Sequence, residues 1–378
     1  MKAVMWWVVI LGVQAPGMLA SQADTSVAPL ELRARADSND PLALYDLAHA
    51  YLNSGRTDEA QRLLETSVQI DGEFAAAYAL LARIRVIRSG ANGVFSDRFA
   101  VAHPSVLAGS PDSATLLFRR SALLEPMQEL DPPAGLEQPA SWRSPLWGAL
   151  QEFWHGRFDQ SAAKLQLAIA KADKKHHAPP PVALWYHALS EYSLRHVDTS
   201  IVDLERLLDA IKIDSSLLEQ STNQRVRYAL AYLHQLAGHT QAAESLYQQV
   251  IERDLSLDLA HMQLARLYET EERWPDAIRE RRAALMIAPE DPTFLYDLGV
   301  TLLEAGELSE AADTLRRVVV RCPRNTRAYY ALGLTLERMR QPQSAGAAYD
   351  RFLQLAPSRY AEMISDAKAR REHLDAGH

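Results

Sequence analysis

The residue pairs most able to do chemistry in this sequence form no recognisable catalytic or metal-binding pattern. His176 and His177 are adjacent at the end of a predicted helix, so their side chains point in different directions and make a poor chelate. His187 and His196 are nine residues apart, whereas metal ligands on one helix face are expected at i, i+3 or i+4. The sequence also lacks a Gly-rich phosphate loop and the H-E-x-x-H, C-x-x-C and G-x-S-x-G motifs. We therefore expect no enzymatic activity, no metal and no cofactor.

Charge and cysteine content narrow the class of protein further. Paired acids such as Glu271-Glu272 lie in predicted turns, where solvation and helix capping explain them. The formal net charge is -8 and the pI is about 5.9, which argues against nucleic acid as a partner, because such proteins normally show a basic surface. Cys322 is the only cysteine, so no internal disulfide can form. We expect it to be a buried structural thiol, with intermolecular pairing as the alternative.

The elements that must position any functional side chain follow a 34-residue repeat in the C-terminal half. Four blocks begin at Gln224, Asp258, Pro292 and Thr326. In each block a large residue precedes a small one at positions seven and eight: Leu230-Ala231, Leu264-Ala265, Leu298-Gly299 and Leu332-Gly333. Position twenty holds a small residue as well: Ala243, Ala277, Ala311 and Ala345. Small residues at both positions let two antiparallel helices approach closely, and the apolar stripe that remains must be covered by the next pair.

This spacing resembles the tetratricopeptide repeat, a 34-residue helix-turn-helix unit with the pattern W-x2-L-G-x2-Y, then A-x3-F, then P. The resemblance implies an all-α fold, an α-solenoid of about eight such units forming a right-handed superhelix. Four regular units occupy residues 224–359, and residues 360–378 supply a capping helix and a tail. The resemblance specifies the architecture better than it specifies the function.

The N-terminal half carries the same pattern less regularly. Residues 41–126 hold two units, and the second helix of the second unit starts 20 residues late, after an insertion over 89–110. A loop this long inside a hairpin is unusual, so it is either a binding element or a surface excursion that tucks its aromatic residues onto the solenoid. A Pro-rich linker over 127–143 and degenerate units over 144–223 follow, in which Ile201 stands where alanine is expected.

The N-terminus predicts export. Lys2 precedes an apolar run over residues 3–13 that is about half of a membrane span, and Ala20 and Ala23 offer small residues for cleavage. We expect residues 1–23 to be a signal peptide, cut after Ala23 or Ala20, and residues 24–40 to be flexible. No transmembrane helix is expected in the mature chain. The predicted location is the periplasm; the alternatives are a secreted protein or one anchored by an uncleaved signal.

The family resemblance also implies where a partner would bind. First helices line the concave face in this family, and the resemblance implies that positions two, five, nine, twelve and thirteen of each unit point into it. The implied partner-binding residues are Arg225, Tyr228, Tyr232, Met262, Arg266, Tyr296, Arg327, Tyr330 and Arg338. Tyrosines with flanking arginines suit a peptide, although tyrosine at the fifth position can also serve packing alone. The lysine and asparagine clamp of some members is not matched, since Tyr45 and His49 occupy those positions.

These features together predict a non-catalytic protein-interaction scaffold of the bacterial cell envelope. It would bind peptide segments or partner proteins and serve in assembling an envelope, secretion or polysaccharide machine. Any association with a membrane would be peripheral and would come through those partners. The alternative is an accessory module of an envelope enzyme that binds a glycan or small molecule, with the insertion and the linker as a lid.

Overall fold

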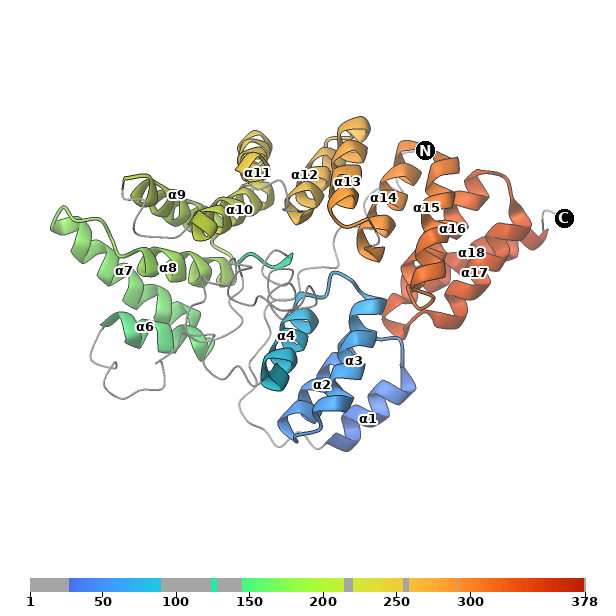
Figure 1. Cartoon of the computed structure of the whole chain (residues 1–378), viewed down its shortest axis with the longest axis horizontal. Helices are drawn as coiled ribbons and strands as arrows, with labels where there is room; N and C mark the ends of the chain where they lie inside the picture. The colour runs from blue at the N-terminus through green and yellow to red at the C-terminus, as the bar shows by residue number, and fades with distance from the viewer. Residues whose placement is uncertain are drawn as a thin grey trace. The chain divides into compact units, whose positions relative to one another are not determined.

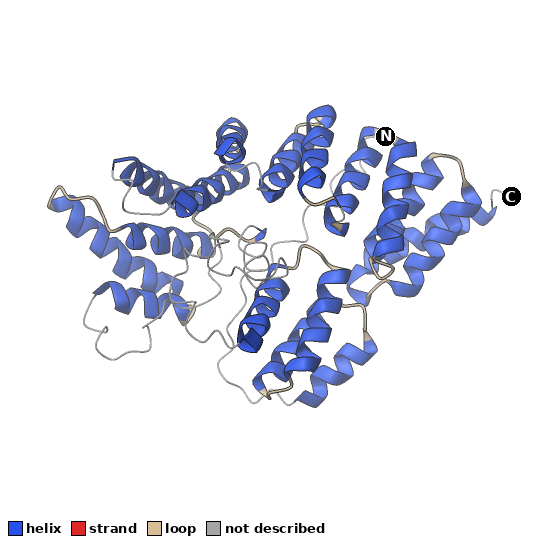
Figure 2. Ribbon diagram, in the orientation of Figure 1, coloured by secondary structure: helices blue, strands red, loops and turns tan. Residues whose placement is uncertain are grey.

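The computed structural model describes residues 27–89, 124–127, 145–213, 220–253, 258–289 and 291–376. Every regular element in those residues is a helix (Figure 2), which confirms the predicted all-α fold. The expected signal peptide lies outside the described residues. So do the insertion and the linker, apart from their first residues, and with them the lid of the alternative hypothesis. None of the helices in the described ranges has the length and apolarity needed to cross a membrane.

The described helices divide between two compact units. The first unit comprises residues 127–226, and the second comprises residues 26–126 together with 227–378. The second unit therefore joins the N-terminal hairpins to the regular C-terminal repeats. The boundary between the units falls within α10 (Gln220–Leu236).

The helices follow one another as hairpins along the chain (Figure 1). The first unit contains α6 (Pro145–Trp154), α7 (Phe158–Lys174), α8 (Pro181–Ser193) and α9 (Val197–Ile213). The N-terminal part of the second unit contains α1 (Val27–Ala36), α2 (Pro41–Asn53), α3 (Thr57–Ile70) and α4 (Ala75–Ser89). Its C-terminal part contains α11 (Thr240–Arg253), α12 (Asp258–Thr270), α13 (Trp274–Ile287), α14 (Pro292–Ala305), α15 (Leu308–Arg321), α16 (Thr326–Arg338), α17 (Pro342–Leu355), a 3-10 turn (Ser358–Tyr360) and α18 (Ala361–Ala376).

A pair of small buried residues, 12 apart in the chain, lies at the contact of each described hairpin. The pairs are Ala48 with Ala60, Ala149 with Ser161, Ala188 with Ser200, Ala231 with Ala243, Ala265 with Ala277, Gly299 with Ala311, and Gly333 with Ala345. A Cβ added at Gly333 would lie 2.6 Å from a ring carbon of Tyr349, and one added at Gly299 would lie 2.7 Å from Cγ of Leu315. The small residues therefore make room for the large residue of the second helix.

The α8–α9 hairpin corrects one expectation. Ser200, rather than Ile201, is the small residue opposite Ala188, and it is fully buried. Its hydroxyl donates to the carbonyl oxygen of Ala188 at 2.9 Å, so the buried polar group is satisfied. Serine thus replaces alanine without disturbing the register of the hairpin.

The N-terminal stretch over 24–40 gives a second correction, because much of it is the helix α1. Val27, Leu30 and Ala34 pack against the hydrophobic cluster of α2 to α4, at spacings of three and four residues that place them on one helix face. The Glu31 carboxylate accepts from the Tyr51 hydroxyl at 2.8 Å. An extra helix therefore covers the first hairpin where flexible chain was expected.

At the other end of the chain, α18 lies where the capping helix is expected. It packs on α17 and buries Ala367 completely. Asp291 caps α14, since its carboxylate accepts from the backbone N–H of Thr293 at 2.9 Å. Asp40 caps α2 in the same way, accepting from Leu42 at 3.1 Å.

Candidate functional site

The polar residues at position twelve of the repeats tie the two helices of a hairpin together. Each accepts hydrogen bonds from the residue at position twenty-four of the same block. Tyr247 donates to Gln235 at 2.9 Å, Arg281 to Glu269 at 3.0 Å and Tyr349 to Glu337 at 2.6 Å. These acceptors therefore already bind a donor within their own hairpin.

Two residues expected to bind a partner lie in the hydrophobic core instead. Tyr228 is fully buried and packs edge-on against Tyr247, with ring centroids 5.7 Å apart. Met262 is 3% exposed, and its Sδ lies 3.3 Å from Nη1 of Arg281. Both side chains pack between neighbouring helices, so the expectation that they contact a partner is corrected.

Four further expected residues occupy other positions in the described helices. The Tyr330 hydroxyl donates to Asp366 of α18 at 2.6 Å, so Tyr330 links α16 to the capping helix. Arg338 is half exposed and donates to the carbonyl oxygen of Leu303 at 2.9 Å. Tyr232 is half-buried on α10. Arg225 belongs to the first unit, where its guanidinium lies 5.0 Å from the ring centroid of Trp185.

The remaining three residues meet on one face of α12, α14 and α16. The Arg327 guanidinium lies 5.1 Å from the ring centroid of Tyr296. Arg266 Nη2 lies 3.8 Å from a carboxylate oxygen of Asp297, the residue after Tyr296. Burial raises the pKa of Tyr296 to about 12, so its phenol keeps a proton to donate at neutral pH. We call Arg266, Tyr296 and Arg327 the arginine face.

A buried ion cluster supports this face, and sequence reasoning missed it. Arg281 Nη1 lies 3.1 Å from Asp297, and Nη2 lies 3.0 Å from Glu269. The Thr301 hydroxyl lies 2.5 Å from Glu269. Burial acts to lower the pKa of Arg281, but the carboxylates of Glu269 and Asp297 outweigh it and raise that pKa. The available signal was the sequence position, because arginine stands where the other regular blocks carry tyrosine or leucine.

A short segment of the same unit lies against the arginine face. The turn between α3 and α4 reads Asp71-Gly72-Glu73, and we call it the acidic turn. Asp71 Oδ1 lies 3.3 Å from Arg327 Nη2. Glu73 forms an ion pair with Arg266, and its other oxygen lies 4.0 Å from Arg327 Nη1. Sequence reasoning did not predict this contact.

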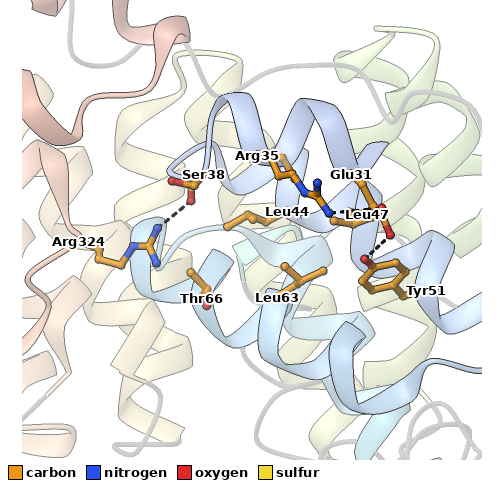
Figure 3. A pocket seen from close by; sticks show the side chains of 10 residues that line it. Glu31, Arg35, Ser38, Leu44, Leu47, Tyr51, Leu63, Thr66 and Arg324 are labelled. Atoms are coloured by element: carbon orange, nitrogen blue, oxygen red, sulfur yellow. Dashed lines mark hydrogen bonds and ion pairs between the residues drawn. The ribbon is translucent and has the colours of Figure 1, made fainter. Parts of the chain in front are cut away.

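A cavity of about 460 Å³ lies beside the first hairpin (Figure 3). Its apolar lining comes from α1, α2 and α3, including Leu44 and Leu47, and Arg324 stands at its edge. The polar groups around it bind one another, because Tyr51 donates to Glu31 and Arg324 donates to the carbonyl oxygen of Ser38 at 2.8 Å. The cavity is lined by none of the predicted partner-binding residues, whereas the arginine face brings three of them together, so we take the arginine face as the candidate functional site.

The repeated hairpins, with their paired small residues, define an α-helical repeat protein. A family model described as tetratricopeptide repeat matches residues 31–84. A second model of that description matches residues 228–292, 262–326 and 296–360. The chain belongs to the tetratricopeptide-repeat family.

A solved structure of another repeat protein agrees with this fold. The C-terminal part of a TPR repeat-containing protein from Cytophaga hutchinsonii superposes with a TM-score of 0.50 at 16% identity, covering 61% of this chain and 92% of that chain. MamA from Desulfovibrio magneticus gives a TM-score of 0.41 at 14% identity over 47% of this chain and 94% of its own. YrrB, described as a TPR protein with an unusual peptide-binding site, gives 0.41 at 16% identity over 54% and 97%.

A curated relative is much longer than the part it shares with this chain. The human protein O-mannosyl-transferase TMTC1 is 25% identical over 160 residues, which are 41% of this chain and 18% of that protein. The chain thus spans less than a fifth of the length of that relative.

Proposed function

We propose that this protein is a non-catalytic scaffold that binds an extended segment of a partner protein on its arginine face. The observation that carries the proposal is the meeting of Arg266, Tyr296 and Arg327 from three consecutive first helices. The tetratricopeptide family and the peptide-binding site named for YrrB support the same class of function.

The chemistry of the face suits a peptide main chain with acidic side chains. Guanidinium groups hold carboxylates through two parallel hydrogen bonds and can also bind carbonyl oxygens. Tyr296 offers an aromatic surface that loses little rotamer entropy on binding, together with a protonated phenol. Asp297 is buried between Arg281 and Arg266, and these contacts hold the Arg266 guanidinium in position before a partner binds.

A selection of peptides tests this function. A random peptide library displayed on phage is panned against the immobilised full chain, and enriched peptides are titrated against variants by fluorescence anisotropy. Arg266→Ala and Arg327→Ala are expected to weaken binding at least tenfold, because each removes a charge-assisted contact of about 1.5 to 3 kcal/mol. Arg282→Ala is the matched control, since Arg282 is exposed on the second helix α13 and pairs with Glu310.

Two results would refute the proposed function. One is a selection that enriches no peptide over an unrelated surface. The other is a set of enriched peptides that bind the Arg266→Ala and Arg327→Ala variants as tightly as they bind the Arg282→Ala control.

We also propose that the scaffold works in a bacterial cell envelope after export. The support is the positively charged start, the short apolar run and the small residues at Ala20 and Ala23. Expression with the natural N-terminus in a Gram-negative host, followed by cell fractionation, should yield a periplasmic protein whose first residue is Asp24 or Ser21. Uncleaved protein in the cytosolic fraction would rule the proposal out.

A further inference from the structure

We propose that the acidic turn is an internal ligand of the arginine face, which a partner must displace before it can bind there. The proposal rests on the proposed function, whose site it shares. It also specifies the partner: a segment that presents two carboxylates on either side of a small residue, as Asp71, Gly72 and Glu73 do.

The contact matches charge to charge. Asp71 and Glu73 bring two carboxylates to the guanidinium groups of Arg327 and Arg266. Arg359 adds a longer contact, with Nη2 3.9 Å from Asp71. The turn is itself ordered, because the backbone N–H of Glu73 donates to the Asp71 carboxylate at 3.2 Å. A pre-ordered acidic loop of this kind can occupy a peptide site with little further entropy loss.

Gly72 allows the close approach. A Cβ at Gly72 would overlap the hydroxyl oxygen of Thr293 and lie 3.1 Å from its Cβ. Thr293 is 9% exposed and stands in the first turn of α14, so it has little room to move away. The backbone of the acidic turn therefore sits directly on the C-terminal repeats.

The contact between the acidic turn and the arginine face is polar, so the carboxylates of a partner can replace those of the turn. Among the described residues, the hydrophobic cluster of α1 to α4 is built from residues 27–84, so these helices have a core of their own. The turn between α1 and α2 adds further polar contacts, since Asn39 donates to the carbonyl oxygen of Leu355 at 2.8 Å and Asp37 accepts from the Ser358 backbone at 2.9 Å. Ion pairs at a partly exposed surface are weak and are screened by salt.

The acidic turn also fits the face incompletely. Nε of Arg327 is buried and makes no hydrogen bond to the described residues, and a buried donor without an acceptor is costly. The side chains of Arg266 and Arg327 remain 35% and 25% exposed. A partner segment can therefore begin to bind at the edge of the face and supply the acceptor that the turn does not.

A peptide copied from the turn tests the internal ligand. The probe is a fluorescein-labelled synthetic peptide of residues 66–78, titrated by anisotropy against the full chain. The tethered turn competes at a local concentration on the order of millimolar, so the wild-type chain should bind the probe weakly. In the Asp71→Asn/Glu73→Gln variant the tethered copy is weakened, and binding of the probe should become at least tenfold tighter.

Three further variants complete the test. Gly72→Ala should also tighten probe binding, because it displaces the turn by a steric clash while leaving its charge unchanged. Glu65→Gln is the matched control, because it neutralises a carboxylate on α3 that accepts from Gln61. This variant should bind the probe as wild type does. Addition of Arg327→Ala to the Asp71→Asn/Glu73→Gln variant should abolish the gain.

The outcomes separate this proposal from the proposed function. The internal-ligand proposal is overturned if wild type and both turn variants bind the probe equally. It is also overturned if none of them binds the probe up to about 1 mM, a concentration well above typical peptide dissociation constants. The scaffold function would still stand if library peptides bind in a manner that requires Arg266 and Arg327. If neither probe nor library peptides depend on these arginines, both proposals fail.

Discussion

At the scale of single residues, the fold depends on how little space certain side chains occupy. Gly333 faces the ring of Tyr349, and Gly299 faces Leu315. Each contact joins residues only 16 apart in the chain. Because such contacts are local and recur with the repeat, the spacing in the sequence is sufficient to predict them.

Substitution of Gly333 tests this packing. Gly333→Ala should destabilise the C-terminal repeats by about 1 to 3 kcal/mol, because the new Cβ must displace the buried ring of Tyr349. Gly148→Ala is the control, since a Cβ there meets nothing within 4 Å in the helix α6; it should be neutral or stabilise by about 0.5 to 1 kcal/mol. Urea denaturation measures both. A Gly333→Ala protein as stable as wild type would mean that the hairpin contact is loose.

The buried cation Arg281 gives a second residue-scale prediction. Arg281→Met should cost about 3 kcal/mol, because it leaves the carboxylates of Asp297 and Glu269 without their main partner in the interior. Arg282→Met, next to it but exposed, should change stability by less than about 0.5 kcal/mol. Thermal and urea unfolding of the two variants make the comparison. Equal effects would show that the buried cluster contributes no net stability.

At the scale of helices, α1 is attached to the first hairpin by its apolar stripe, by the ion pair of Arg33 with Asp46 and by the Glu31 carboxylate. Hydrogen bonds from Tyr51 and then Arg56 lower the pKa of Glu31. A carboxyl group whose pKa is lower in the folded state stabilises that state fully above its unfolded pKa of about 4.3, and the stabilisation is lost as the pH falls through the lowered value. Attachment of α1 should therefore weaken in acid.

Protonation of Glu31 can be followed directly. In protein carrying ¹³C-labelled glutamate, the Glu31 carboxyl resonance should titrate below the ordinary glutamate range, and contacts between α1 and α2 should weaken over that same interval. Glu31→Gln should remove this dependence while leaving the rest of the titration unchanged. An ordinary pKa for Glu31, or α1 contacts that do not change down to pH 3, well below the ordinary glutamate pKa, would contradict the prediction.

The elements show which parts of the structure the sequence could predict. The hairpins of the four regular blocks follow from their periodic small and large residues. Ser200 and α1 were harder to predict. A serine fits this alanine position because the carbonyl oxygens of Ala188 and His196 accept from its hydroxyl. The apolar stripe of α1 is short, and its role is evident only once it packs against the cluster of α2 to α4.

At the scale of the whole molecule, the acidic turn could not have been predicted from one sequence. Asp71 and Arg327 are 256 residues apart, and neither carries a local pattern that points to the other. The expected face was read from repeat positions, which locate first-helix residues but do not show what covers them. Tyr228, Met262 and Tyr330 illustrate the same limit, since neighbouring helices bury or cover them.

Docking of the N-terminal helices on the C-terminal repeats is measured most directly as a distance. Spin labels at Gln69→Cys on α3 and Ser344→Cys on α17, in a Cys322→Ser background, place one exposed probe on each side of the contact within the second unit. Double electron–electron resonance at low salt should give one narrow distance population for this protein. Adding Asp71→Asn/Glu73→Gln, or raising NaCl to about 1 M, where charges are screened beyond ~3 Å, should add a second, longer population. An identical distribution under all three conditions would contradict an arginine face held by the acidic turn.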